Sequence, residues 1–140
     1  MSNIDTAISI SDEQLFTELT SEEGAVIEGG ALLLLHKATA IKASSDIASN
    51  TNGDDVVVKA DGKKIHGTVK DVETGETFNI NKFHVIDGTA SITFFDADVW
   101  GNADDYLGGF TVGNSPTNGK KWKRISGSDS IYDVQYEVIA

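Results

Sequence analysis

Apolar and polar positions follow two different periods along the chain, and the change falls near Gly30. Before it, Leu15, Phe16 and Leu19 share one stripe at helical spacing. After it, short runs alternate between apolar and polar residues with a period of two, and clusters of Gly, Asn and Asp separate them. We therefore predict a short N-terminal helix followed by a domain built from strands.

Eight strands are predicted after Gly30. The last one alternates most clearly, which predicts one buried and one solvated face. Asp61-Gly62 has the form of a hairpin turn, and no helical pattern interrupts the strands. The chain is thus predicted to be all-β, with one eight-stranded antiparallel β-sandwich over residues 31–140. The predicted strands are Ala31–Ile41, Val56–Ala60, Lys63–Val69, Thr77–Val85, Ala90–Phe95, Tyr106–Val112, Lys120–Ile125 and Ile131–Ile139.

The N-terminal helix is predicted to begin at Asp12, because Ser11 and Gln14 have the spacing of a capping box. It ends at the latest at Gly29-Gly30. The sequence Leu-Thr-Ser-Glu-Glu-Gly-Ala-Val-Ile-Glu-Gly-Gly, residues 19–30, resembles the double-glycine leader peptides of bacteriocins and related secreted bacterial peptides. The matching positions are Leu19, Glu23, Ile27, Gly29 and Gly30, whereas Gly24 departs from the large apolar residue that is usual there.

This resemblance implies a leader peptide over residues 1–30 that the peptidase domain of an ABC exporter removes after Gly30. The protein would then be cytoplasmic as a precursor and secreted after cleavage, with Ala31 as its first residue. Two glycines suit a narrow protease cleft, because they offer backbone without a side chain. A helix C-cap followed by a linker is the alternative interpretation of the same two glycines.

Charge is distributed unevenly along the 140 residues, whose net charge is −11. Residues 1–30 hold seven acidic side chains and no Lys or Arg, so the acid is concentrated at the N-terminus. Non-specific nucleic-acid binding depends on basic surface, so we predict no nucleic-acid partner. The chain has no cysteine and therefore neither disulfides nor thiolate metal sites. We find no nucleophile or general-acid pattern and predict that the protein is not an enzyme.

Aspartates are clustered in two segments between predicted strands. Calcium takes six to eight oxygen ligands, and clustered carboxylates on loops commonly supply them. Loops of a sandwich gather at its two ends, so both segments could line one oxygen-rich site. The alternative is that these aspartates bind no metal and only occupy solvent-exposed turns, which Asp favours. The candidate metal ligands are Asp46, Asp54 and Asp55 in the first segment and Asp96, Asp98, Asp104 and Asp105 in the second.

The pattern Phe-Asp-x-Asp-(x)5-Asp-Asp-x-Leu-Gly, residues 95–108, and Asp-Val-Val-Val-Lys, residues 55–59, resemble a C2 domain, a sandwich that binds calcium and often phospholipid. The resemblance covers residues 31–140 and implies Ca2+ as cofactor. It assigns ligand positions to Asp96, Asp98 and Asp104, with Asp105 where one extra residue has entered. In the first segment it assigns Asp55, or Asp54 if the register slips by one, and Asp46 across a longer gap than usual.

Val99 and Trp100 lie at the tip of the second acidic segment, where C2 domains insert side chains into lipid. The resemblance therefore implies contact with an anionic phospholipid membrane, for which Trp is suited by its apolar ring and polar N–H. Packing of Trp100 into the core is the alternative. The basic run Lys120–Arg124 likewise has two interpretations, a site for polyanions or a charged edge strand that prevents aggregation.

The sequence thus favours a secreted bacterial calcium-binding C2-like module that docks to membranes. Two other functions stay open: a metal-independent adhesive or structural sandwich that binds a protein or glycan, and a bacteriocin-like membrane-active protein.

Overall fold

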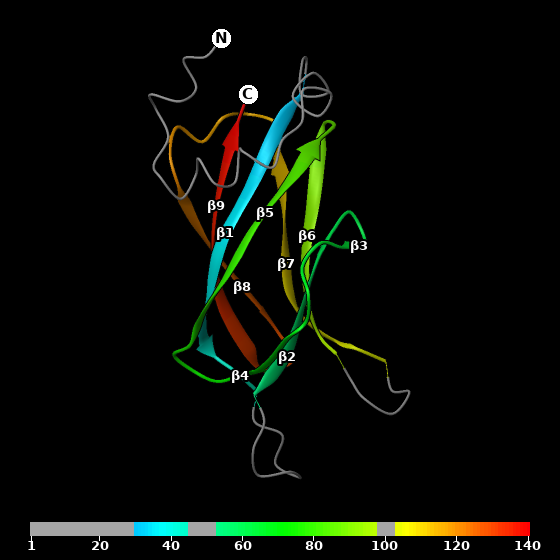
Figure 1. Cartoon of the computed structure of the whole chain (residues 1–140), viewed down its shortest axis with the longest axis vertical. Coiled ribbons are helices and arrows are strands. Elements are labelled where there is room, and N and C mark those ends of the chain that lie inside the picture. The colour runs from blue at the N-terminus through cyan, green and yellow to red at the C-terminus, as the bar shows by residue number, and fades with distance from the viewer. Residues whose placement is uncertain (1–29, 45–52, 98–102) are drawn as a thin grey trace.

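The computed structural model describes residues 30–44, 53–97 and 103–140. Over these ranges, nine antiparallel strands form two sheets that pack face to face as a sandwich (Figure 1). The strands are β1 (Ala31–Lys42), β2 (Asp54–Ala60), β3 (Lys63–Lys64), β4 (Val69–Val72), β5 (Thr77–Ile86), β6 (Thr89–Asp96), β7 (Asp105–Gly113), β8 (Lys121–Gly127) and β9 (Ser130–Ile139).

The strand order defines two sheets, which we call the first and the second sheet. The first has the order β5-β1-β9-β8, and the second has the order β3-β2-β6-β7 with β4 paired to β2. β1 therefore lies inside the first sheet, between β5 and β9. β8 is an edge strand, which agrees with the basic edge predicted from Lys120–Arg124.

The predicted all-β antiparallel sandwich is confirmed, but one predicted strand is wrong. The expected strand Lys63–Val69 is two short strands, β3 and β4. Between them the chain leaves the sheet after a single backbone hydrogen bond from Ile65 N to Val58 O, and it pairs with β2 again at Val69. The predicted N-terminal helix lies outside the described residues.

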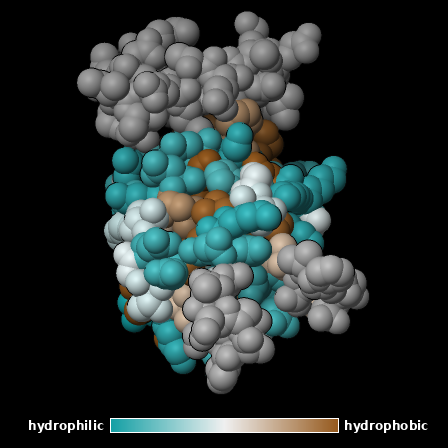
Figure 2. Space-filling view, turned by 60° about the horizontal axis from the view of Figure 1, so that its bottom comes forward, coloured by the Kyte–Doolittle hydropathy of each residue, from teal (hydrophilic) through white to brown (hydrophobic). Residues whose placement is uncertain are grey.

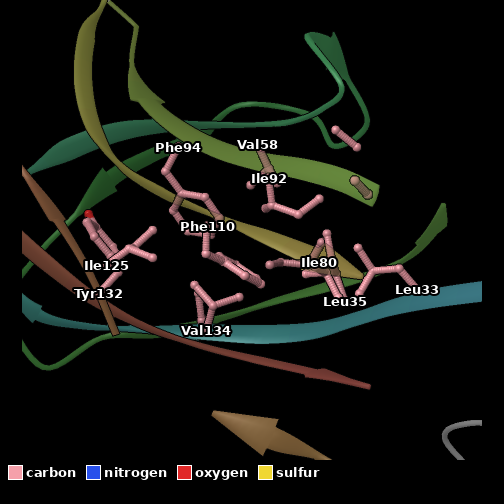
Figure 3. Packing of buried hydrophobic residues seen from close by; sticks show 14 of the residues in the cluster. Leu33, Leu35, Val58, Ile80, Ile92, Phe94, Phe110, Ile125, Tyr132 and Val134 are labelled. Atoms are coloured by element: carbon pink, nitrogen blue, oxygen red, sulfur yellow. The ribbon is translucent and has the colours of Figure 1, made fainter. Parts of the chain in front are cut away.

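The core lies between the sheets and is built by alternation along each strand (Figure 3). In β9, Tyr132, Val134 and Val138 are buried, as the period of two predicts. Tyr132 packs against Phe94 of the second sheet, with ring centroids 5.7 Å apart. Aromatic pairs at this distance bury much apolar area and hold the two sheets in one relative position.

The two sheets also meet backbone to backbone at one corner. A Cβ atom added to Gly127 of β8 would lie 2.5 Å from the carbonyl oxygen of Tyr106 in β7. Only glycine allows this approach. β7 is thereby held against the hairpin of β8 and β9 just where β7 begins.

A buried carboxylate lies close to this contact, because Ser130, the register partner of Gly127, donates a hydrogen bond to Asp54. Asp54, the first residue of β2, has no exposed surface. Its Oδ1 accepts a hydrogen bond from the Ser44 hydroxyl at 2.5 Å. Its Oδ2 accepts hydrogen bonds from the hydroxyls of Ser130 at 2.9 Å and Tyr132 at 2.6 Å. Three hydroxyl donors offset much of the cost of burying this charge.

This arrangement, the Asp54 hub, joins segments that are far apart in sequence. Ser44 follows β1, Asp54 begins β2, and Ser130 and Tyr132 lie in β9. The amide of Ser44 also donates to the Ser130 hydroxyl at 3.0 Å. Burial, together with the hydrogen bond to Asp54, raises the pKa of the Tyr132 hydroxyl above its ordinary value of 10.0.

Replacing Tyr132 by Phe should lower the free energy of unfolding by about 1.5–3 kcal/mol, because a buried charge loses one hydrogen-bond donor. Equilibrium urea unfolding of the full chain measures this loss. The difference should shrink above pH 10.0, since the unfolded tyrosine ionises there and the folded Tyr132 does not.

Tyr136→Phe is the matched control for this substitution. Tyr136 lies on the same strand, and its hydroxyl has no hydrogen-bond partner among the described residues. Its loss should change stability by no more than about 0.5 kcal/mol. Equal losses in both variants would contradict the assigned role of Tyr132.

Candidate functional site

The two acidic segments attach to the same end of the sandwich, the lower end in Figure 1. β1 ends there and β2 begins there, on either side of residues 45–52. β6 ends there and β7 begins there, on either side of residues 98–102. The strand ends that flank the two acidic segments therefore lie at the same end of the sandwich.

Strand register brings three aspartate positions together at this end of the second sheet. Asp96 at the end of β6 is the register partner of Val56 in β2 and of Asp105 in β7. Asp55 is the residue before Val56. These aspartates were predicted in loops, but Asp54, Asp55, Asp96 and Asp105 are the terminal residues of strands. Sheet hydrogen bonding thus positions them more rigidly than a loop would.

A direct hydrogen bond links the two acidic segments. The amide of Asp55 donates to Asp96 Oδ1 at 2.6 Å. The amide of Ala97 donates in return to the carbonyl oxygen of Asp55 at 2.8 Å. Both residues are partly buried, so the interaction holds the Asp96 carboxylate beside the backbone of Asp55.

The Asp55 side chain is oriented by β4. Its Oδ1 accepts a hydrogen bond from the amide of Asp71 at 2.9 Å. Asp71 has a φ of 55°, in the left-handed region that Asp adopts more readily than most residues. A carboxylate oxygen has two lone pairs, so accepting one N–H still permits it to ligate a cation.

Asp54 and Asp55 have different roles although they are adjacent. Successive side chains of a strand point to opposite faces, so Asp54 points into the hub and Asp55 points away from it. Asp54 has no exposed surface and accepts three hydroxyl donors, so it is poorly placed to ligate a metal. Of the two first-segment positions that the sequence left open, the geometry favours Asp55.

Of the other predicted site residues, three lie within the described residues and the rest lie outside them. Asp104 and Asp105 are exposed at the start of β7. Gly30 is described and directly precedes β1. The remaining predicted residues lie outside the described ranges; they are Asp46, Asp98, Val99, Trp100 and Gly29.

Within residues 30–44, 53–97 and 103–140, no three His, Asp or Glu side chains are grouped as metal ligands. The described part of the site therefore consists of oriented carboxylates rather than a complete ligand set. No helix in the described residues is long and apolar enough to cross a membrane.

Sequence reasoning missed the residues that surround Asp54. Ser44 and Ser130 resemble ordinary turn residues, and no local pattern marks them. Tyr132 offered one signal, because it stands on the buried stripe of β9 and a buried tyrosine hydroxyl requires a partner. That signal identifies a need for an acceptor but not which acceptor meets it.

A separate polar contact lies at the opposite end of the sandwich. His84 Nε2 of β5 is 2.7 Å from Asp61 Oδ2 in the turn after β2, so this pair connects the two sheets. A hydrogen bond from the Ser91 amide, and then the one from His84, lower the pKa of the Asp61 carboxyl. The predicted hairpin turn at Asp61-Gly62 is confirmed, with φ angles of 50° and 81°.

The lower end of the molecule faces forward in Figure 2. The described surface there is largely hydrophilic and carries a smaller hydrophobic area between polar residues (Figure 2). A mainly polar surface with oriented carboxylates suits an ionic ligand better than a large apolar one.

No protein-family profile matches the chain, and no curated protein sequence matches it. Solved structures of C2 domains, however, are similar to it. A structure described as a C2 domain gives a TM-score of 0.47 and 16% identity over 79% of this chain and 99% of that chain. A C2 domain of plant extended synaptotagmin 1 gives 0.45 and 12% over 76% of this chain and 91% of that chain.

The calcium-bound pair of C2 domains from extended synaptotagmin 2 superposes more closely. It aligns with a TM-score of 0.51 and 13% identity over 78% of this chain and 45% of that chain. This chain thus spans less than half of that two-domain structure. Together with the two antiparallel sheets, this likeness shows that residues 30–44, 53–97 and 103–140 form a C2-like β-sandwich.

Proposed function

We propose that this protein is a calcium-binding C2-like module that docks to anionic phospholipid membranes through the end carrying Asp55 and Asp96. The observation that carries the proposal is the pairing of these two residues. β2 and β6 come from distant parts of the chain, yet they place two carboxylates at one sheet end. The Asp96 carboxylate accepts a hydrogen bond from the Asp55 amide, and the Asp55 carboxylate accepts one from the Asp71 amide. The proposed function is binding and includes no catalytic step.

The donor chemistry of the described residues fits calcium. Asp55, Asp96, Asp104 and Asp105 offer only carboxylate oxygens, the hard ligands that calcium prefers, and the chain has no cysteine to favour a softer metal. Their crowding also has an electrostatic cost that a cation would relieve. The C2-like fold and the calcium-bound state of extended synaptotagmin 2 lend support.

The chain's own residues would act as an electrostatic switch. In the absence of cation, the carboxylates create a negative potential that repels anionic headgroups. A bound calcium would neutralise this potential and supply a positive charge for phosphate oxygens. Val99 and Trp100 at the tip of the same segment would then add apolar contact with lipid. Calcium and membrane would reinforce each other's binding because they are linked ligands.

Calcium should stabilise the full chain against thermal unfolding. With a dissociation constant of about 10⁻⁴–10⁻³ M, as in extracellular modules, 10 mM calcium should add about 1.4–2.7 kcal/mol. Calorimetric titration and thermal melts measure both quantities. Asp96→Asn combined with Asp98→Asn should abolish the effect, while asparagine keeps an oxygen that accepts the Asp55 amide.

Asp87→Asn is the control for the loss of charge. Asp87 lies in the turn between β5 and β6, at the opposite end of β6 from Asp96, so its removal should leave the calcium effect intact. No heat and no melting shift for the natural chain at millimolar calcium would overturn the proposal.

Membrane contact can be followed with Trp100. The chain has two tryptophans, so Trp122→Phe makes Trp100 the single reporter. Its fluorescence should shift to shorter wavelength only when calcium and vesicles containing phosphatidylserine are both present, because the indole enters lipid only after neutralisation. An unchanged spectrum with both ligands, or a blue-shifted one with neither, would exclude docking by this tip.

Export is a further proposal, which rests on the resemblance of residues 19–30 to double-glycine leaders. A cut after Gly30 would leave every described strand intact, because β1 begins at Ala31. Mass spectrometry of secreted material should find Ala31 at the N-terminus. Extracellular protein that begins at Met1 or Ser2 would contradict leader removal.

A further inference from the structure

β1 contains four consecutive leucines directly after its first residue, Ala31, and all four are buried. Leu33 and Leu35 belong to the main core between the sheets. Leu32 and Leu34 form a separate cluster, because alternate residues of a strand point to opposite faces. These two leucines therefore lie on the outer face of the first sheet, away from the core.

The outer cluster is organised by the strand register. Leu32 is the partner of Val85 in β5 and of Ile139 in β9, and Leu34 is the partner of Phe83 in β5. We call these five residues the outer patch. It is a contiguous apolar surface across three strands, not a single misplaced leucine.

Leu32 and Leu34, at the centre of the outer patch, are more deeply buried than the sandwich accounts for, whereas Phe83, Val85 and Ile139 are partly buried. Leu32 and Leu34 are 0% and 1% exposed, although all residues described as packing on them belong to the same sheet. All described strands belong to the two sheets, so none of them forms a third layer over this face. Side chains on the open face of a two-layer sandwich normally remain accessible to water.

Charged side chains of both signs border the outer patch, because Glu137 is the partner of Leu34 in β9 and its Oε1 lies 3.4 Å from His36 Nε2, while Lys37 is basic. Lys37 follows the leucines in β1, and its Nζ lies 5.9 Å from the ring centroid of Trp122 in β8. Trp122 is 51% exposed, and Arg124, two residues further along the same side of β8, forms an ion pair with Asp133 of β9 at 2.8 Å. A partner that combines an apolar stripe with acidic flanks would complement both parts of this face.

Residues 1–29 have this combination and are joined directly to the patch. They carry Leu15, Phe16 and Leu19 at helical spacing, seven acidic residues and no Lys or Arg. Leu19 precedes Leu32 by thirteen residues, which can span up to roughly 40 Å when extended. Such a short tether gives an effective concentration of about the millimolar order, which favours an intramolecular contact over any partner in solution.

We propose that residues 1–29 form the third layer of this domain, with the stripe of Leu15, Phe16 and Leu19 on the outer patch and the acidic residues beside Lys37 and β8. This contact does not depend on calcium binding. It gives cleavage after Gly30 a structural consequence, because removal of the segment converts a covered apolar face into an exposed one.

Distance measurement between spin labels tests the contact in the full chain, which has no natural cysteine. One pair is Glu18→Cys with Asn79→Cys, an exposed position of β5 on the same face as Phe83. The control pair is Glu18→Cys with Thr111→Cys, an exposed position of β7 on the outer face of the second sheet. The first distance should be narrowly distributed and shorter by at least about 10 Å, the separation of packed sheets. Equally broad or equally long distributions would overturn the proposal.

A dye that binds exposed apolar surface provides an independent test. Leu15→Ser with Phe16→Ser and Leu19→Ser should raise its fluorescence several-fold, whereas Thr17→Ser with Thr20→Ser, which leave the stripe intact, should not. Sedimentation of the natural chain should show a monomer. A dimer would mean that a second copy covers the patch, and calcium-independent binding to neutral vesicles would mean that lipid does; either result would refute the proposal.

Discussion

The buried negative charge of Asp54 is the constraint on which the functional end of this domain depends. A carboxylate without exposed surface is tolerated only when donors surround it, and here all three are hydroxyls. They come from the end of β1 and the start of β9, so the hub determines how these strands meet β2. Because its members are mutually dependent, the network specifies one arrangement of this end rather than several.

The position of Asp55 follows from that of Asp54. With Asp54 turned inward, strand alternation turns Asp55 outward, where β4 and the last residue of β6 orient it. Two adjacent, chemically identical residues thus have different roles: Asp54 is a buried structural charge, and Asp55 is a candidate metal ligand. The Asp54 charge also lies close to the site and adds to the negative potential that would attract a cation.

Two surfaces of the domain are physically distinct. The carboxylate end is polar, formed by strand termini, and suited to an ion and to headgroups. The outer patch is apolar, lies on the body of the first sheet, and is suited to an amphipathic segment. Because ion binding is electrostatic and the contact on the outer patch combines apolar burial with charge complementarity, salt should weaken the first more than the second.

The prediction of a C2-like sandwich from sequence succeeded where the signal was local. Alternation in β9, the turn at Asp61-Gly62 and the strand limits of β1 and β5 are all readable within a few residues. The break between β3 and β4 was missed, although Gly67 lies within it and Gly weakens the interior of a strand. The extension of β2, β6 and β7 through their terminal aspartates was also missed, since Asp usually indicates a turn.

Sequence by itself determined the period of each strand, the clustering of acid beside strand ends and the apolar stripe before Gly30. Only tertiary structure decided which of Asp54 and Asp55 is buried, which hydroxyls satisfy it, and that Leu32 and Leu34 form a second apolar face. The physical reason is the sequence separation over which each feature is decided. Alternation is a property of neighbouring residues, whereas the partners of Asp54 in β9 lie 76 and 78 residues away and are selected by the register of whole sheets.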